Sequence, residues 1–123
     1  MREGTRRDRF LVAEMLRHAE VIEENVRKGR TIFDRDPSTR YAVEHAVELF
    51  SEAAEKVSAR FERANPGIPW KGLRPLRRDV AHPYDGGRPP VNPERVGRFV
   101  RDDVPRIMRK LRSATYPASG EGA

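Results

Sequence analysis

Residues 36–61 read DPSTRYAVEHAVELFSEAAEKVSARF, and their pattern sets the architecture of the chain. Asp36 can cap the start of a helix, and Pro37 suits the first helical position because its missing N–H would have no partner there. Apolar side chains then recur at the spacing of one helical face. They are Val43, Ala46, Phe50, Ala53, Val57 and Phe61. We therefore expect one long amphipathic helix that runs to the breaker Asn65-Pro66-Gly67.

A second apolar stripe lies on the N-terminal side of this helix. It predicts an amphipathic helix from about Arg7 to Lys28, with Gly29 as the residue that ends it. The stripe consists of Leu11, Met15, Ala19, Ile22 and Val26.

Proline and glycine divide the C-terminal half of the chain. A shorter helix is expected to begin near Pro69 and to reach toward His82, with a kink or break after Arg74 because Pro75 follows. Residues 85–90 contain two glycines and two prolines and predict an irregular loop.

A last helix should open at Asn92-Pro93-Glu94 and bend at Pro105. Its apolar positions are Val96, Phe99, Val100, Ile107, Met108 and Leu111. No alternating strand pattern and no internal repeat occurs in the chain.

Each of these helices needs a partner for its apolar stripe, so the expected fold is all-α, a mostly antiparallel bundle of four to five helices. We expect the bundle to span residues 1–116 as one domain, and residues 117–123 to form a disordered tail. A bundle this small leaves apolar surface that a second copy can cover, and we take a homodimer as a hypothesis.

The composition narrows the classes of function. The chain has no cysteine, which excludes disulfides, thiolate metal sites and cysteine nucleophiles and fits a reducing cytoplasm. No apolar run of signal or membrane length occurs, so we expect a cytoplasmic protein that does not enter a membrane. With three histidines and no close pairing of them, a transition-metal site is not expected.

The formal net charge of +6 suggests a polyanionic partner, although solvated helix faces account for it equally well. The excess is concentrated late in the chain. Five basic residues against two acidic ones lie between positions 71 and 88, and seven against three lie between positions 94 and 112. This placement favours an anionic ligand near these segments. Lys71, Arg74 and Arg78 are the candidate RNA-binding residues, and a plain charged face is the equal alternative for them.

The stretch from Leu76 to Tyr84 joins an arginine, a histidine and a tyrosine. Arg77 precedes His82 by five positions, and on an ideal helix the two side chains would point about 140° apart. They can meet at one phosphate if the helix unwinds near Pro83, or if a second copy supplies half of the site.

Ile68-Pro69-Trp70, followed by Arg77, His82 and Tyr84 at this spacing, resembles the HepT-like toxins of the HEPN superfamily. Ser51-Glu52-Ala53 and the proline in the last helix extend the resemblance over most of the chain. It implies a dimeric helical bundle that acts as a metal-independent ribonuclease toxin, an endoribonuclease without cofactor, beside a small nucleotidyltransferase antitoxin. Arg77 and His82 would then be the catalytic pair, and Tyr84 the residue that the antitoxin modifies with AMP.

The chemistry agrees with these roles. Cleavage of RNA by its own 2′-hydroxyl needs a group that moves protons and a cation that stabilises charge on the phosphate, and His82 and Arg77 fit these two needs. AMP on Tyr84 would place bulk and negative charge two residues from the histidine. It would oppose the entry of RNA by occlusion and by charge repulsion.

Two departures from the family pattern keep a second hypothesis open, a catalytically inactive helical adaptor that binds a nucleotidyltransferase partner. Arg78 stands where the family has asparagine, so that Asp79 is the remaining candidate for a supporting polar role. Pro83 biases His82 away from helical geometry. Of the other notable residues, we interpret Trp70 as a core anchor rather than a base-stacking platform.

Overall fold

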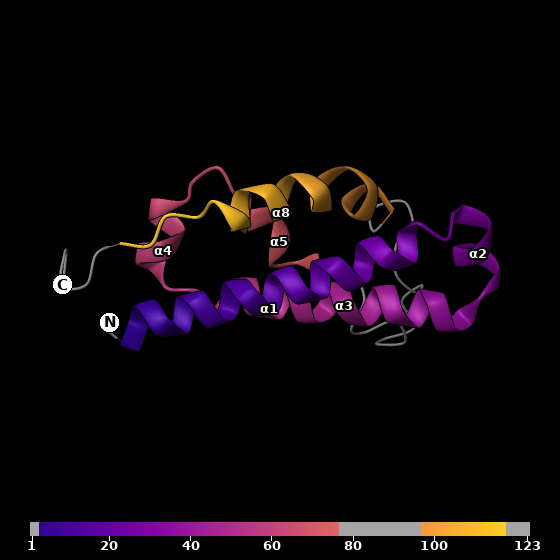
Figure 1. The fold of residues 1–123 in the computed structure, drawn as a ribbon, viewed down its shortest axis with the longest axis horizontal. Coiled ribbons are helices and arrows are strands. Elements are labelled where there is room, and N and C mark those ends of the chain that lie inside the picture. Colours follow the sequence, from indigo (N-terminus) through magenta and orange to yellow (C-terminus); the bar gives the residue numbers. More distant parts are fainter. Residues whose placement is uncertain (1–2, 77–96, 118–123) are drawn as a thin grey trace.

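The computed structural model describes residues 3–76 and 97–117, and within these ranges every regular element is a helix. The all-α prediction is confirmed. Helices α1 (Glu3–Val26) and α3 (Pro37–Lys56) form a long antiparallel hairpin closed at one end by the short helix α2 (Arg30–Arg35) (Figure 1). They make the most extensive helix–helix contact in the described chain. None of the described helices is long and apolar enough to cross a membrane.

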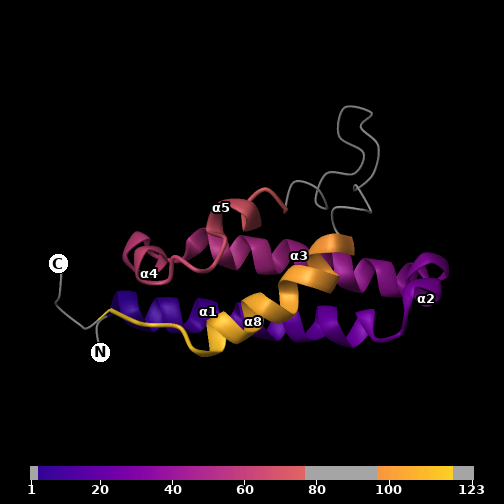
Figure 2. The same cartoon turned by 90° about the horizontal axis from the view of Figure 1, so that it is seen from above.

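The remaining helices cover this hairpin. α4 (Ala59–Ala64) and α5 (Trp70–Leu73) follow α3, and a π-helical turn, η2 (Phe99–Asp103), leads into α8 (Val104–Arg112). Figure 2 shows α8 crossing α1 obliquely, and both η2 and α8 pack against α1. The predicted apolar stripes meet in one core. Its fully buried large side chains include Met15, Ile22, Val43, Phe50, Phe61, Ile107 and Leu111.

The first helix differs from its predicted bounds at both ends. It begins at Glu3 and ends at Val26, whereas we expected Arg7 and Lys28. The backbone N–H of Gly29 still donates to the Val26 carbonyl at 3.0 Å, and Gly29 has a φ of 92°. Since this left-handed conformation strains any residue with a Cβ, Gly29 is the corner between α1 and the unpredicted helix α2.

The predicted cap of the next helix is confirmed. Asp36 accepts a hydrogen bond from the Ser38 N–H at 3.0 Å and another from the Thr39 hydroxyl at 2.8 Å. Pro37 occupies the first turn of α3, where no N–H is required.

The prediction of one continuous helix from Pro37 through Phe61 is wrong. α3 ends at Lys56, the chain is extended at Val57, and Ser58 caps the new helix α4 by accepting the Phe61 N–H at 3.1 Å. The cause lies on α1. The buried Asp8 carboxylate accepts the Ser58 N–H at 2.8 Å and the Ser58 hydroxyl at 2.7 Å, which stabilises the break.

Trp70 opens α5 and is only 4% exposed, as expected for a core anchor. Its indole N–H donates to the Asn65 carbonyl at 3.0 Å, and its ring meets Phe61 edge to face with centroids 5.8 Å apart. α5 ends at Leu73, so the predicted break near Pro75 is confirmed. The predicted continuation toward His82 lies outside the described residues.

The last helix contains a wide turn just before its proline. The Val104 N–H donates to the carbonyl of Phe99, five residues back, instead of four. On a regular α-helix residues five apart point about 140° apart. The wider turn brings Phe99 round toward the side of Val104, and both side chains are buried. This π-helical turn lies just before Pro105, the position at which we expected a bend.

Asn65 holds the end of the chain against the bundle. The side-chain NH2 group of Asn65 donates to the backbone carbonyl of Thr115 at 2.8 Å, and the side-chain oxygen Oδ1 of Asn65 accepts the backbone N–H of Thr115 at 2.9 Å. Tyr116 then packs on Phe61 with ring centroids 5.1 Å apart, while the Arg9 guanidinium lies 4.0 Å from the Tyr116 ring centroid. The predicted tail beyond residue 117 lies outside the described residues.

Candidate functional site

The predicted catalytic and modification residues belong to the segment 77–96, which lies outside the described residues. This segment holds Arg77, Arg78, Asp79, His82 and Tyr84. The described elements that precede and follow the segment carry two of the predicted RNA-binding residues, Lys71 on α5 and Arg74 at its end.

The described residues on either side of the segment lie close together. Leu76 immediately precedes it, Arg98 and Phe99 follow it closely, and the three residues line one pocket of about 270 Å³. We call this hollow the α5–α8 pocket. Its remaining lining residues are Pro69, Gly72, Leu73, Asp103 and Arg106. Leu76 and Phe99 are buried, so both ends are anchored in the core.

A buried serine fixes the chain where it approaches the motif. Ser51, on α3, is fully buried, and its hydroxyl lies 2.6 Å from the Leu73 carbonyl oxygen and 3.0 Å from that of Arg74. Carbonyls at a helix end have no partner within the helix, and a side-chain donor can satisfy them. Ser51 thus sets the position of the residues that lead into Leu76 and Arg77.

A second hollow, of about 590 Å³, lies on the other side of α5. We call it the α4–α5 pocket. It is lined by Glu62, Arg63 and Lys71 together with the apolar residues Ala59, Pro66, Ile68, Pro69 and Trp70 and the exposed Gly72. Because Pro69 and Gly72 line both pockets, the two hollows are neighbours separated by α5.

In both pockets the positively charged side chains outnumber the negatively charged ones. The acid in each is paired, since Arg74 forms a close ion pair with Glu62, and Arg106 lies 2.8 Å from Asp103. Three further cations line the pockets, make no ion pair within the described residues and are exposed. They are Arg63, Lys71 and Arg98. The predicted RNA-binding residues are therefore placed differently, because Lys71 faces solvent whereas Arg74 is held by Glu62.

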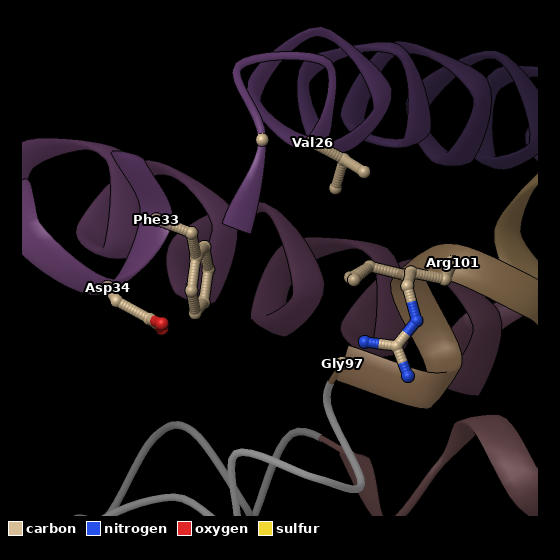
Figure 3. A pocket seen from close by; sticks show the side chains of 7 residues that line it. Val26, Phe33, Asp34, Gly97 and Arg101 are labelled. Carbon is tan, nitrogen blue, oxygen red and sulfur yellow. The ribbon is translucent and has the colours of Figure 1, made fainter. Parts of the chain in front are cut away.

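A third pocket, of about 200 Å³, lies where α1, α2 and the start of the last helix meet. Figure 3 shows the Phe33 ring and the Val26 side chain at this pocket, with the Arg101 guanidinium turned toward Gly97. The lining is mostly apolar, and Asp34 and Arg101 are its charged residues.

Two of the three histidines, His18 and His45, lie on the α1–α3 hairpin. His18 is partly buried, its Nε2 lies 3.5 Å from a Glu14 carboxylate oxygen, and His45 is exposed. Burial is the largest cause that lowers the pKa of His18, while Glu14 opposes it. In the part of the chain that the structure describes, no group of three or more His, Cys, Asp or Glu side chains could hold a metal ion.

Comparison with known proteins identifies the family. The profile described as "Ribonuclease HepT-like" matches residues 15–114, a range that covers most of the bundle and the whole of the segment 77–96. The chain belongs to the HepT-like ribonuclease family. The resemblance read from Ile68-Pro69-Trp70 and the Arg77, His82 and Tyr84 spacing is thereby confirmed.

Three relatives of this HepT-like ribonuclease match with similar identity. A probable ribonuclease HepT of Thermococcus cleftensis is 31% identical over 76 residues, which cover 62% of this chain and 66% of that protein. Two putative RNases of Methanocaldococcus jannaschii are 30% and 29% identical over 64% and 72% of this chain and 69% and 70% of their own lengths. The matched regions thus span about two thirds of each relative. No solved structure gives a significant match.

Three residues that shape the site, Arg63, Arg98 and Ser51, were not among the predicted site residues. Arg63 lies eight residues before Lys71 and Arg98 twenty-seven residues after it, and the packing of α4 and the last helix beside α5 brings their pockets together. The concentration of basic residues between positions 94 and 112 was the available signal for Arg98. Ser51 belongs to the Ser51-Glu52-Ala53 stretch of the resemblance, but its burial could not be predicted, because a serine in a helix is ordinarily solvated.

Proposed function

We propose that this HepT-like ribonuclease is the toxin of a toxin–antitoxin pair and cuts RNA internally without a metal ion. The observation that carries the proposal is the family match over residues 15–114, which contains Arg77 and His82 at the spacing that the resemblance requires. The names of the three relatives, one probable and two putative RNases, support the same chemistry.

In the proposed reaction the 2′-hydroxyl of RNA attacks the adjacent phosphorus, and the bond from phosphorus to the 5′-oxygen breaks. His82 takes the 2′-hydroxyl proton and returns a proton to the leaving 5′-oxygen, and Arg77 stabilises the charge on the phosphate oxygens. The products are a 2′,3′-cyclic phosphate and a free 5′-hydroxyl. Asp79 would act as a supporting polar residue, and Lys71 and Arg78 as contacts to the RNA backbone.

The described structure supports this assignment in two ways. The chain enters the motif segment from Leu76, which is buried next to Arg98 and Phe99 of the last helix. Ser51 holds the carbonyls just ahead of that point. Anchored ends of this kind are what a catalytic segment needs, since small displacements of reacting groups are costly in rate.

The test is incubation of the purified protein with total RNA and with tRNA in EDTA, resolved on a denaturing gel. We expect cleavage by the wild type and none by Arg77→Ala or His82→Ala. Arg35→Ala and His45→Ala, which change surface residues of the same types, serve as matched controls and should cleave normally. Absence of cleavage by unmodified wild type would instead favour the inactive adaptor that binds a nucleotidyltransferase partner.

The proposal extends to control by that partner. A small nucleotidyltransferase antitoxin would transfer AMP to the Tyr84 hydroxyl, with pyrophosphate leaving from ATP. Coexpression followed by intact-mass measurement should show one added AMP on wild type and on Tyr41→Phe, which alters an exposed tyrosine, and none on Tyr84→Phe. Full silencing of Tyr84→Phe by the antitoxin would contradict this mode of control.

The homodimer also remains a proposal. Phe10, Ile32 and Tyr41 are 62%, 43% and 71% exposed, which is apolar surface that a second copy can cover. Light scattering at micromolar concentration should report a dimer, and a purely monomeric protein would refute it. We place the toxin, its antitoxin and the RNA substrate in the cytoplasm, which agrees with a chain that has no cysteine.

A further inference from the structure

We propose that the α4–α5 and α5–α8 pockets form one groove that binds the backbone of single-stranded RNA. We call it the α5 groove. The inference rests on the proposed ribonuclease function and adds to it a substrate-binding surface outside the motif segment. The groove passes over α5 and leads to Leu76, the residue that precedes Arg77.

The continuity of the groove follows from the residues that its two halves share. Pro69 and Gly72 line both pockets, so among the described residues the single turn of α5 separates the two hollows. Gly72 lies in this turn and has no side chain that could separate the two pockets. A Cβ added there would meet no heavy atom of the described residues within 4 Å, so on their side the space next to Gly72 is open. A strand can therefore cross from one pocket to the other.

The charge of the groove selects the ligand class. Arg63 and Lys71 on one side of α5 and Arg98 on the other are exposed and have no ion-pair partner among the described residues. The two acids in the lining, Glu62 and Asp103, are already paired with arginines. Cations without partners along a groove are the arrangement that tracks a polyanionic backbone.

The lining of the groove favours contacts to the RNA backbone over reading of the bases. Trp70 lines the floor, but it is 4% exposed and its indole N–H is bound to the Asn65 carbonyl. It therefore has no free face on which a base could stack. Binding should depend on phosphate contacts, with little base preference and a strong dependence on salt.

The first experiment measures anisotropy of a fluorescein-labelled 12-nucleotide RNA in the His82→Ala background, which prevents cleavage during titration. We expect Lys71→Glu and Arg98→Glu each to weaken binding by about three- to tenfold near 0.1 M salt, and to lower the salt slope by about 0.7 for each phosphate that the variant no longer neutralises. Arg35→Glu makes the same charge change on α2, at the end of the hairpin distant from α4, and should bind like the parent (Figure 1).

A second set of variants tests the crossing point without removing any cation. Gly72→Ala adds the smallest side chain at the crossing point and should weaken binding least of the series. Alanine also suits a helix better than glycine, so this variant should fold. Gly72→Gln should weaken binding by obstruction, and Gly72→Glu, of equal bulk, should weaken it further by repulsion. Circular dichroism confirms that each variant is folded.

The outcomes separate this inference from the ribonuclease proposal. If Lys71→Glu and Arg98→Glu bind RNA as tightly as Arg35→Glu, the α5 groove is wrong even when the wild type cleaves. If they lose binding while the wild type cleaves nothing, the groove stands and the ribonuclease assignment fails. If polyglutamate of matched charge binds as tightly as the RNA and shows the same losses, the surface docks an acidic protein and the RNA assignment is overturned.

Discussion

The Ser51 hydroxyl lies 2.6 Å from the carbonyl oxygen of Leu73, twenty-two residues further along the chain. This hydrogen bond joins the middle of α3 to the end of α5 inside the core. It matters for function because the next few residues lead into the Arg77 and His82 segment. A hydrogen bond inside the bundle thereby holds the backbone just ahead of the candidate catalytic segment.

Replacing Ser51 by alanine should destabilise the protein by about 1–3 kcal/mol, because the carbonyls of Leu73 and Arg74 lose a buried donor. Urea unfolding measures the change. Ser38→Ala, at an exposed position of the same helix, is the matched control and should change stability little. Equal stability of the two variants would show that water replaces the hydroxyl.

Removing the Asp8 carboxylate should unfold α4 more readily. Asp8→Ala leaves the Ser58 N–H and hydroxyl without their acceptor, and we expect a loss of about 1–3 kcal/mol. A double-mutant cycle with Ser58→Ala should give a coupling energy of at least about 0.5 kcal/mol. Strict additivity would mean that the break after Lys56 does not depend on Asp8.

His18 should titrate below its ordinary pKa of 6.5, because burial disfavours the charged imidazolium. Glu14 opposes the shift, whereas Arg17 and His45 add to it. The folded state then binds the proton more weakly than the unfolded chain. Stability linked to His18 is present above pH 6.5 and is lost as the pH falls from there toward the lowered folded-state pKa.

An NMR titration checks this behaviour. The imidazole signal that disappears in His18→Gln identifies the residue, and its midpoint should lie below 6.5. The variant should also show a smaller loss of stability on acidification than the wild type. A midpoint at or above 6.5 would contradict the assignment of burial as the dominant cause.

Asn65→Ala should free the C-terminal segment. The Thr115 N–H and carbonyl both lose their partners on Asn65, so deuterium exchange at the Thr115 amide should accelerate. The Ser113 amide donates to the Arg109 carbonyl within the helix end and serves as the internal control. Unchanged exchange at Thr115 would show that the contact of Tyr116 with Phe61 suffices to hold the segment.

Trp70 is the only tryptophan of the chain, so its fluorescence reports on the state of the core. Its burial and its bond to the Asn65 carbonyl predict weak quenching by acrylamide and a red shift on unfolding. Trp70→Phe should cost about 0.5–1.5 kcal/mol from the lost hydrogen bond alone. RNA should leave the emission nearly unchanged, whereas strong quenching by RNA would indicate stacking on the indole.

The sequence predicted more of the site's chemistry than of its surroundings. Arg77, His82 and Tyr84 could be proposed because their spacing and the Ile68-Pro69-Trp70 stretch are local patterns. The pairing of Arg74 with Glu62 and the openness of Lys71 could not, because an ion pair between residues twelve apart depends on how α4 and α5 pack.

The sequence by itself determined the two long helices of the hairpin and the start of α3, since apolar periodicity and the Asp36-Pro37 cap act within a few residues of each other. It also determined the all-α class, because every apolar stripe requires a helical partner. Only the tertiary structure decided that α3 stops at Lys56 and that Leu76 lies beside Arg98. Both follow from contacts over long separations, in which Asp8 stabilises a helix end across fifty residues and core packing joins two distant segments.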